Sequence, residues 1–135
     1  MIRLEGLVKS FGSTRALDGV DVEFDAGRAY GVVGPNGCGK TTLFRILTGL
    51  LTHDAGSVTV MGGAPSDVDP TKVGYMPQRE ALYRDLTVRE NVRFFAELCG
   101  LRGQVLASQI DEVLRLTALV EHQTKTVEQL SGGMA

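Results

Sequence analysis

The sequence has few cysteines and no long apolar run, and both shortages limit what the protein can be. Its two cysteines, Cys38 and Cys99, lie far apart without paired spacing, which predicts neither a disulfide framework nor a zinc site. No segment approaches the roughly 18 apolar residues of a membrane-spanning helix. Residues 1–5 alternate apolar and charged side chains, unlike the continuous apolar stretch of a signal peptide. We therefore expect a cytoplasmic protein, and if it serves a membrane, it does so through a partner.

Clustered positive charge is also lacking. The 14 Lys and Arg residues stand singly and are outnumbered by 16 Asp and Glu residues, giving a net charge of -2. Because proteins that bind a polyanionic backbone gather basic residues on one surface, we expect no nucleic-acid partner. The hydrophobic content of 43% over 135 residues indicates a folded domain with a core.

Four segments have the patterns of β-strands. Residues 20–25 alternate apolar and charged side chains, which predicts a half-solvated, antiparallel strand. Residues 29–33 are apolar throughout, as in a parallel strand buried on both faces at the centre of a sheet. Residues 57–61 and 72–76 predict further strands on either side of a turn-rich segment.

Three segments have helical periodicity. A helix is predicted over 40–50, and a second runs from a capping box of Thr87 and Glu90 to about Cys99. Gly100 and Gly103 then bracket a break before the third. The apolar positions behind these predictions are Leu43, Ile46, Leu47 and Leu50, then Val88, Val92, Phe95 and Leu98, then Leu106, Ile110, Val113 and Leu114.

A phosphate-binding loop is predicted between the apolar segment 29–33 and the first helix. Two glycines five apart are followed by Lys and a hydroxyl residue, so backbone N–H groups and a helix N-terminus can face phosphate oxygens. Lys40 would place its charge on the terminal phosphates, and the Thr41 hydroxyl can bind Mg²⁺. A glycine-rich turn that binds nothing is the alternative, but motif and flanks both match. The predicted nucleotide-binding residues are Gly34, Pro35, Asn36, Gly37, Cys38, Gly39, Lys40, Thr41 and Thr42.

The phosphate loop alone leaves ATPases, GTPases and small kinases possible, and a second motif decides between them. It is Leu130-Ser131-Gly132-Gly133-Met134, and Gln78 closes a segment between the two motifs. In this order of phosphate loop, glutamine loop and signature, the chain resembles the ATP-binding subunits of ABC transporters. Met134 departs from the glutamine usual in the family.

The resemblance implies an ATP site with Mg²⁺ shared between two subunits in a head-to-tail dimer. Ser131, Gly132 and Gly133 would meet the γ-phosphate of ATP held by the other subunit, and Gln78 would help to bind the metal. Lys40, Gln78 and Ser131 would be the catalytic residues. Phe11 occupies the place of an aromatic residue that stacks on adenine. Without the resemblance, Ser131, Gly132 and Gly133 are also compatible with a flexible turn or a helix cap. Gln78 is then compatible with a polar loop residue, and Phe11 with a buried aromatic residue at the end of a strand.

The fold that the resemblance implies is α/β: a P-loop NTPase core with an N-terminal antiparallel β region and a helical subdomain. Residues 1–78 would form the β region and core, 79–130 the helical subdomain, and 131–135 the start of the signature helix. In the family a strand ending in Asp-Glu and a switch histidine follow, and neither is in the sequence. We expect a domain incomplete at its C-terminus that binds nucleotide without useful turnover.

The implied function is to couple ATP binding and hydrolysis to solute movement through a transmembrane permease, at the cytoplasmic face of the membrane. Residues 79–130 would dock the permease, and the segments from Thr87 to Gly100 look most like those of exporters. A soluble ABC ATPase without a transport role and a non-catalytic nucleotide-binding fragment are the alternatives.

Overall fold

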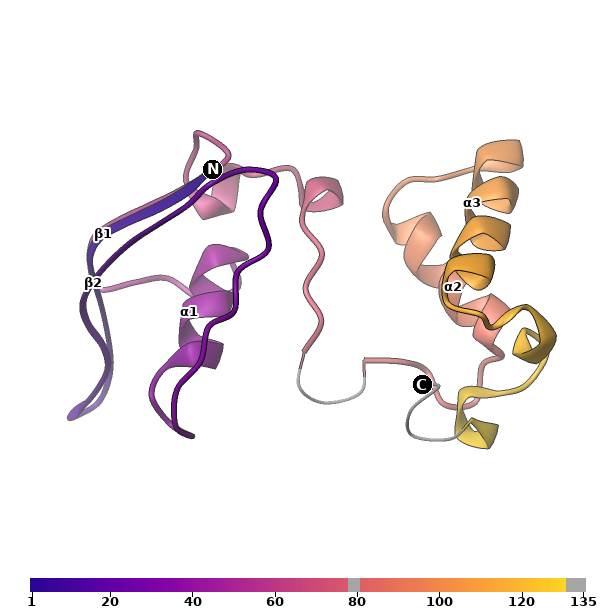
Figure 1. Ribbon diagram of the computed structural model, residues 1–135, viewed down its shortest axis with the longest axis horizontal. Coiled ribbons are helices and arrows are strands. Elements are labelled where there is room, and N and C mark those ends of the chain that lie inside the picture. Colours follow the sequence, from indigo (N-terminus) through magenta and orange to yellow (C-terminus); the bar gives the residue numbers. More distant parts are fainter. Residues whose placement is uncertain (78–80, 131–135) are drawn as a thin grey trace. The chain divides into compact units, whose positions relative to one another are not determined.

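The computed structural model of the protein describes residues 1–77 and 81–130. The chain divides into two compact units, Met1–Tyr75 and Met76–Ala135, and each has its own hydrophobic core (Figure 1). The boundary predicted between residues 78 and 79 lies outside the described residues and stays a prediction.

A β-hairpin and a third strand form the sheet of the first unit. Strand β1 (Ile2–Phe11) pairs antiparallel with both β2 (Thr14–Phe24) and β3 (Ala55–Val60), giving the order β2-β1-β3. Leu4 lies opposite Val22 on one side and Val58 on the other, so the register places apolar residues side by side. The antiparallel strand predicted at 20–25 and the strand predicted at 57–61 are confirmed.

Helix α1 (Lys40–Leu47) packs on this sheet and completes the core of the first unit. The helix ends sooner than predicted because Gly49 has a φ of 73°, which an α-helix does not continue. Leu50 is consequently 64% exposed rather than buried. The buried core residues are Leu4, Leu7, Leu17, Leu43, Ile46, Leu47, Val58 and Val60.

Two of the predicted strands are wrong. Residues 29–33 have no regular structure, and the side chain of Val33 is 91% exposed. Residues 72–76 follow a short 3₁₀ turn, Pro70–Lys72, without joining a sheet, and Met76 is 93% exposed. A strand exists only when its backbone groups pair with a neighbour, and none of the described residues forms a ladder with either segment.

Two helices and two short 3₁₀ turns form the second unit. Helix α2 (Val88–Leu98) and helix α3 (Gly103–Leu116) bury Val88, Leu106, Ile110 and Leu114 between them, as predicted. The turns span Val120–His122 and Val127–Gln129. Among the described residues, no helix has the length and apolar character needed to cross a membrane.

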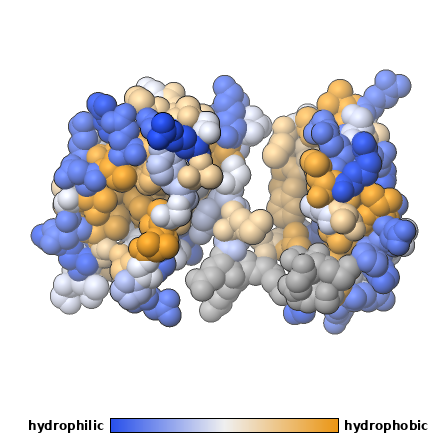
Figure 2. Space-filling model, in the orientation of Figure 1, coloured by the Kyte–Doolittle hydropathy of each residue, from blue (hydrophilic) through white to orange (hydrophobic). Residues whose placement is uncertain are grey.

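Some apolar side chains predicted on the inner helix faces remain at the surface. Leu98 is 67% exposed, Phe95 38% and Val113 37%. Figure 2 shows hydrophobic residues among hydrophilic ones on the surface of both units. Neither core covers the whole apolar surface of its own helices.

The capping box at the start of α2 is formed as predicted. The Thr87 hydroxyl accepts from the Glu90 N–H at 3.2 Å, and the Glu90 carboxylate accepts from the Thr87 N–H at 2.8 Å. Hydrogen bonds from the Thr87 hydroxyl and N–H lower the pKa of Glu90. This reciprocal pair fixes where the helix begins.

Asn91 ties the segment before α2 to the helix itself. It is 3% exposed, and its side-chain oxygen accepts from the Tyr83 N–H at 2.9 Å. Its amide nitrogen donates to the carbonyl oxygens of Tyr83, Leu86 and Thr87. A buried amide that satisfies both its own polar atoms and the backbone of an irregular segment specifies that segment's path.

We predict that Asn91→Ala lowers the free energy of unfolding of the second unit by about 2–3 kcal/mol, because it leaves buried backbone groups without partners. Glu97→Ala, an exposed change on the same helix, should cost less than about 0.5 kcal/mol. Urea denaturation followed by circular dichroism measures both. Equal losses would show that the Asn91 hydrogen bonds do not hold the segment.

Candidate functional site

The predicted phosphate loop lies directly before α1 and rests on the β-hairpin. Gly37 and Gly39 have φ values of 84° and 94°, in the left-handed region that favours glycine. A Cβ on Gly39 would overlap the carbonyl oxygen of Ala16 and lie 2.9 Å from the Leu17 side chain. Only glycine allows the loop to lie this close to β2.

Several backbone N–H groups at this loop have no acceptor among the described residues. Within residues 34–42, the Cys38 N–H reaches the Pro35 carbonyl at a long 3.4 Å. Other N–H groups of the loop and first helical turn donate to no oxygen of the described residues: those of Gly37, Gly39, Lys40, Thr41 and Thr42. No acidic residue stands in the first turn of α1. Free N–H groups and the positive end of a helix dipole fit an anion.

Lys40 turns back onto its own loop. Its ammonium donates to the carbonyl oxygens of Gly34 at 2.8 Å and Pro35 at 2.7 Å, and lies 3.6 Å from the Cys38 sulfur. The positive charge is therefore held within the loop that the sequence predicts to bind phosphate. Its contact with terminal phosphates stays a prediction.

Thr41 is the one predicted Mg²⁺ ligand that the structure describes. It is exposed in the first turn of α1, and its hydroxyl has no hydrogen-bond partner among the described residues. The described residues hold no cluster of three or more His, Cys, Asp or Glu residues suited to a metal. A threonine hydroxyl can be one ligand of Mg²⁺ that takes others from phosphate and water.

Phe11, the predicted adenine-stacking residue, ends β1 opposite Thr14 with its ring half exposed. The Lys9 ammonium lies 5.6 Å from the ring centroid. Asp54 holds that ammonium at 2.7 Å and also accepts from the Ser10 N–H, and these two hydrogen bonds lower the pKa of Asp54. An exposed aromatic face is available at the hairpin that carries the loop, and stacking on a base stays a prediction.

Four predicted site residues, Gln78, Ser131, Gly132 and Gly133, lie outside the described residues. The structure therefore brings together the loop, α1 and β2, whose Ala16 and Leu17 lie against Gly39. Phe11 lies at the end of β1 in the same hairpin. The packing of Gly39 against β2 was not predicted, since the glycine pattern indicates a turn but not the surface that the turn meets.

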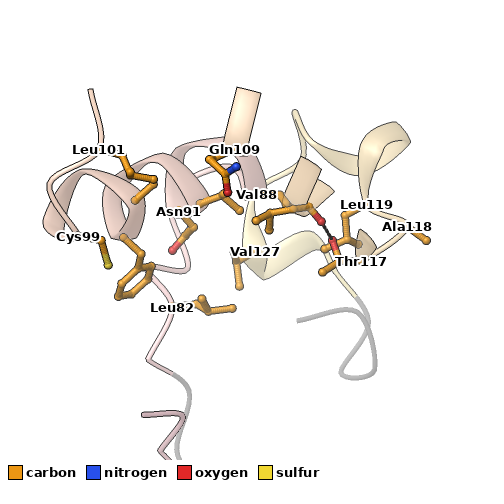
Figure 3. Close-up of a pocket in the computed structure, with 14 residues that line it drawn as sticks. Leu82, Val88, Asn91, Cys99, Leu101, Gln109, Thr117, Ala118, Leu119 and Val127 are labelled. Atoms are coloured by element: carbon orange, nitrogen blue, oxygen red, sulfur yellow. Dashed lines mark hydrogen bonds between the residues drawn. The ribbon is translucent and has the colours of Figure 1, made fainter. Parts of the chain in front are cut away.

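A hollow in the second unit was also not predicted. It has a volume of about 900 Å³, and Asn91 of α2, Cys99 just after α2, and Gln109 of α3 lie around it (Figure 3). Its sequence signal is that α2 and α3 carry more apolar positions, such as Phe95 and Val113, than the small core of the unit buries. The residues that line it are Leu82, Val88, Asn91, Val92, Phe95, Ala96, Cys99, Leu101, Gln109, Val113, Thr117, Ala118, Leu119 and Val127.

We predict that Gly39→Ala destabilises the first unit by at least about 1 kcal/mol more than Gly37→Ala. Both variants force alanine into a left-handed backbone, but no atom lies within 4 Å of a Cβ on Gly37. The difference isolates the overlap with β2. Thermal denaturation measures it, and equal losses would mean that the loop does not rest on the hairpin.

Comparisons with known proteins identify the family of this chain. Residues 17–135 match the family model described as "ABC transporter". The chain is 34% identical, over 99% of its length, to the linearmycin resistance ATP-binding protein LnrL of Bacillus subtilis (strain 168). It is 42% identical, also over 99% of its length, to the probable multidrug ABC transporter ATP-binding protein YbhF of Escherichia coli (strain K12).

The chain spans 44% of the first of these relatives and 24% of the second. A solved structure of the ATP-binding subunit of an ABC transporter has the same fold, with a TM-score of 0.83 at 24% identity. That likeness covers 98% of this chain and 57% of the other. The family match spans most of the chain and includes the phosphate loop. The chain therefore belongs to the ABC transporter family, within its ATP-binding domain.

Proposed function

We propose that residues 34–42 bind the phosphates of ATP. The observation that carries this proposal is the set of backbone N–H groups at the loop and the N-terminus of α1 that lack a protein acceptor. Phosphate oxygens would accept from these groups, and the helix dipole would favour their negative charge. The φ values of Gly37 and Gly39 give the curled backbone that such binding needs.

Lys40 would supply the positive charge. Its ammonium already lies at the loop, so a shift from the carbonyls of Gly34 and Pro35 to phosphate oxygens exchanges neutral acceptors for negatively charged ones. The Thr41 hydroxyl would hold Mg²⁺, which neutralises phosphate charge when bound. The half-exposed ring of Phe11 would stack on adenine.

For the whole protein we propose ATP hydrolysis in a head-to-tail dimer. Ser131, Gly132 and Gly133 would contact the γ-phosphate held by the second copy, and Gln78 would help to bind Mg²⁺. The family of ATP-binding subunits supports this role. Alternating closure and opening of the two copies around ATP would then drive the movement of a transmembrane permease.

We further propose that the second unit docks a transmembrane permease at the cytoplasmic face of the membrane. The apolar hollow between α2 and α3 offers a surface into which a partner segment can insert. The names of the two relatives, one for linearmycin resistance and one for multidrug transport, support export of a solute. Permease docking would couple ATP turnover to movement of that solute.

We predict that Lys40→Ala weakens ATP·Mg²⁺ binding by about ten- to a hundredfold, which is the effect of losing one charge-assisted contact. Lys125→Ala, which removes an exposed lysine from the second unit, should leave the affinity unchanged. Calorimetric titration of the folded variants measures both. If the folded parent chain binds no ATP, the motif does not form a site.

Docking at the hollow predicts that Val113→Glu reduces co-purification of the whole protein with its permease at least about tenfold, because a charge there would be buried against an apolar partner. The control is Val105→Glu on the same helix, since Val105 is 58% exposed and does not line the hollow. If both variants lose co-purification equally, or if neither loses it, the permease docks elsewhere.

A further inference from the structure

The ammonium of Lys40 has an acceptor for each of its N–H groups. A protonated lysine has three donors and no acceptor. The structure provides two backbone carbonyl oxygens, on Gly34 and Pro35, and one sulfur, on Cys38. The lysine therefore has no spare donor to offer an incoming phosphate, and each new contact must replace one of these three.

Cys38 is the acceptor that a side chain supplies, and its position is confined. A Cβ on Gly34 would lie 2.7 Å from the Cys38 sulfur, so the thiol occupies the space beside Gly34. The carbonyl of that same glycine accepts from Lys40. The thiol and the ammonium thus lie against the same stretch of backbone, and the size and polarity of residue 38 bear directly on how the ammonium is held.

We propose that Cys38 is a positioning residue for Lys40, which it helps to hold against the loop carbonyls before nucleotide binds. Sulfur is a weak acceptor, and its 3.6 Å contact is the longest of the three, so this is the contact that a phosphate oxygen replaces first. The identity of residue 38 then sets part of the free energy that separates the empty loop from the occupied one. This inference rests on the proposed ATP site.

The physical reason is linkage between the two states of the loop. An interaction made only in the empty loop stabilises that state and lowers the affinity for a ligand that must break it. Removing the sulfur should therefore tighten binding, whereas a better acceptor at the same position should loosen it. A residue that merely shapes the loop would not show opposite signs for the two changes.

A double-mutant cycle tests the proposal. ATP·Mg²⁺ affinity is measured for Cys38→Ala and Cys38→Ser, each with Lys40 present and with Lys40→Met. With Lys40 present, Cys38→Ala should lower the dissociation constant about two- to fourfold, and Cys38→Ser should raise it slightly, as the serine oxygen is a stronger acceptor. Both effects should vanish with Lys40→Met, because the held ammonium is gone.

A second measurement needs no nucleotide. In the empty protein, the proton exchange rate of the Lys40 ammonium, followed by ¹⁵N NMR, should rise at least about twofold in Cys38→Ala and not in Cys38→Ser, since exchange requires a free N–H. Failure of the parent chain to bind ATP would overturn the ATP site but leave this measurement decisive for the lysine.

Three results would overturn the proposal. The first is an unchanged ammonium exchange rate in Cys38→Ala. The second is a shift of ATP affinity in the same direction and by the same factor for alanine and serine. The third is a shift that persists in full with Lys40→Met, which would show that residue 38 acts on nucleotide directly and not through the lysine.

Discussion

The contact between Gly39 and β2 is the constraint on which the candidate site depends. It places the last glycine of the loop against the Ala16 carbonyl, so the start of α1 is set by the hairpin and not by the loop alone. The buried side chains of Leu43, Ile46 and Leu47 then hold the helix on the same sheet. The segment that carries the free N–H groups of the loop is thereby held in place, which favours the binding of an anion.

The second unit obtains its order in a different way. Its core is small, and polar contacts complete it: the Thr87–Glu90 capping box, the buried Asn91 amide, and Arg89. The Arg89 guanidinium contacts the Asp111 carboxylate of α3 at 2.8 Å and the side chain of Gln123 at 2.6 Å. These contacts add to the apolar packing between α2 and α3, and an apolar hollow beside the core remains uncovered.

Sequence patterns predicted the elements whose stability is local. The capping box was correct, and the helical periodicity located all three predicted helices, although α1 ends before Leu50 and some apolar positions remain exposed. The alternation at residues 20–25 was also correct, because β1 provides the strand that pairs with it. The strand predicted at 29–33 depends on a pairing partner far along the chain, and apolar content alone does not supply one. In the site, the glycines could be predicted, but not the surface that Gly39 meets.

The saturated ammonium of Lys40 also bears on which anions the loop can discriminate. Chloride or acetate offers few acceptor positions, so it can replace only part of the contacts that Lys40 makes with Gly34, Pro35 and Cys38. A polyphosphate presents many oxygens at once and can replace those contacts together while it engages the backbone N–H groups. We therefore expect a loop that holds its own lysine to favour polyphosphates over small anions with few oxygens.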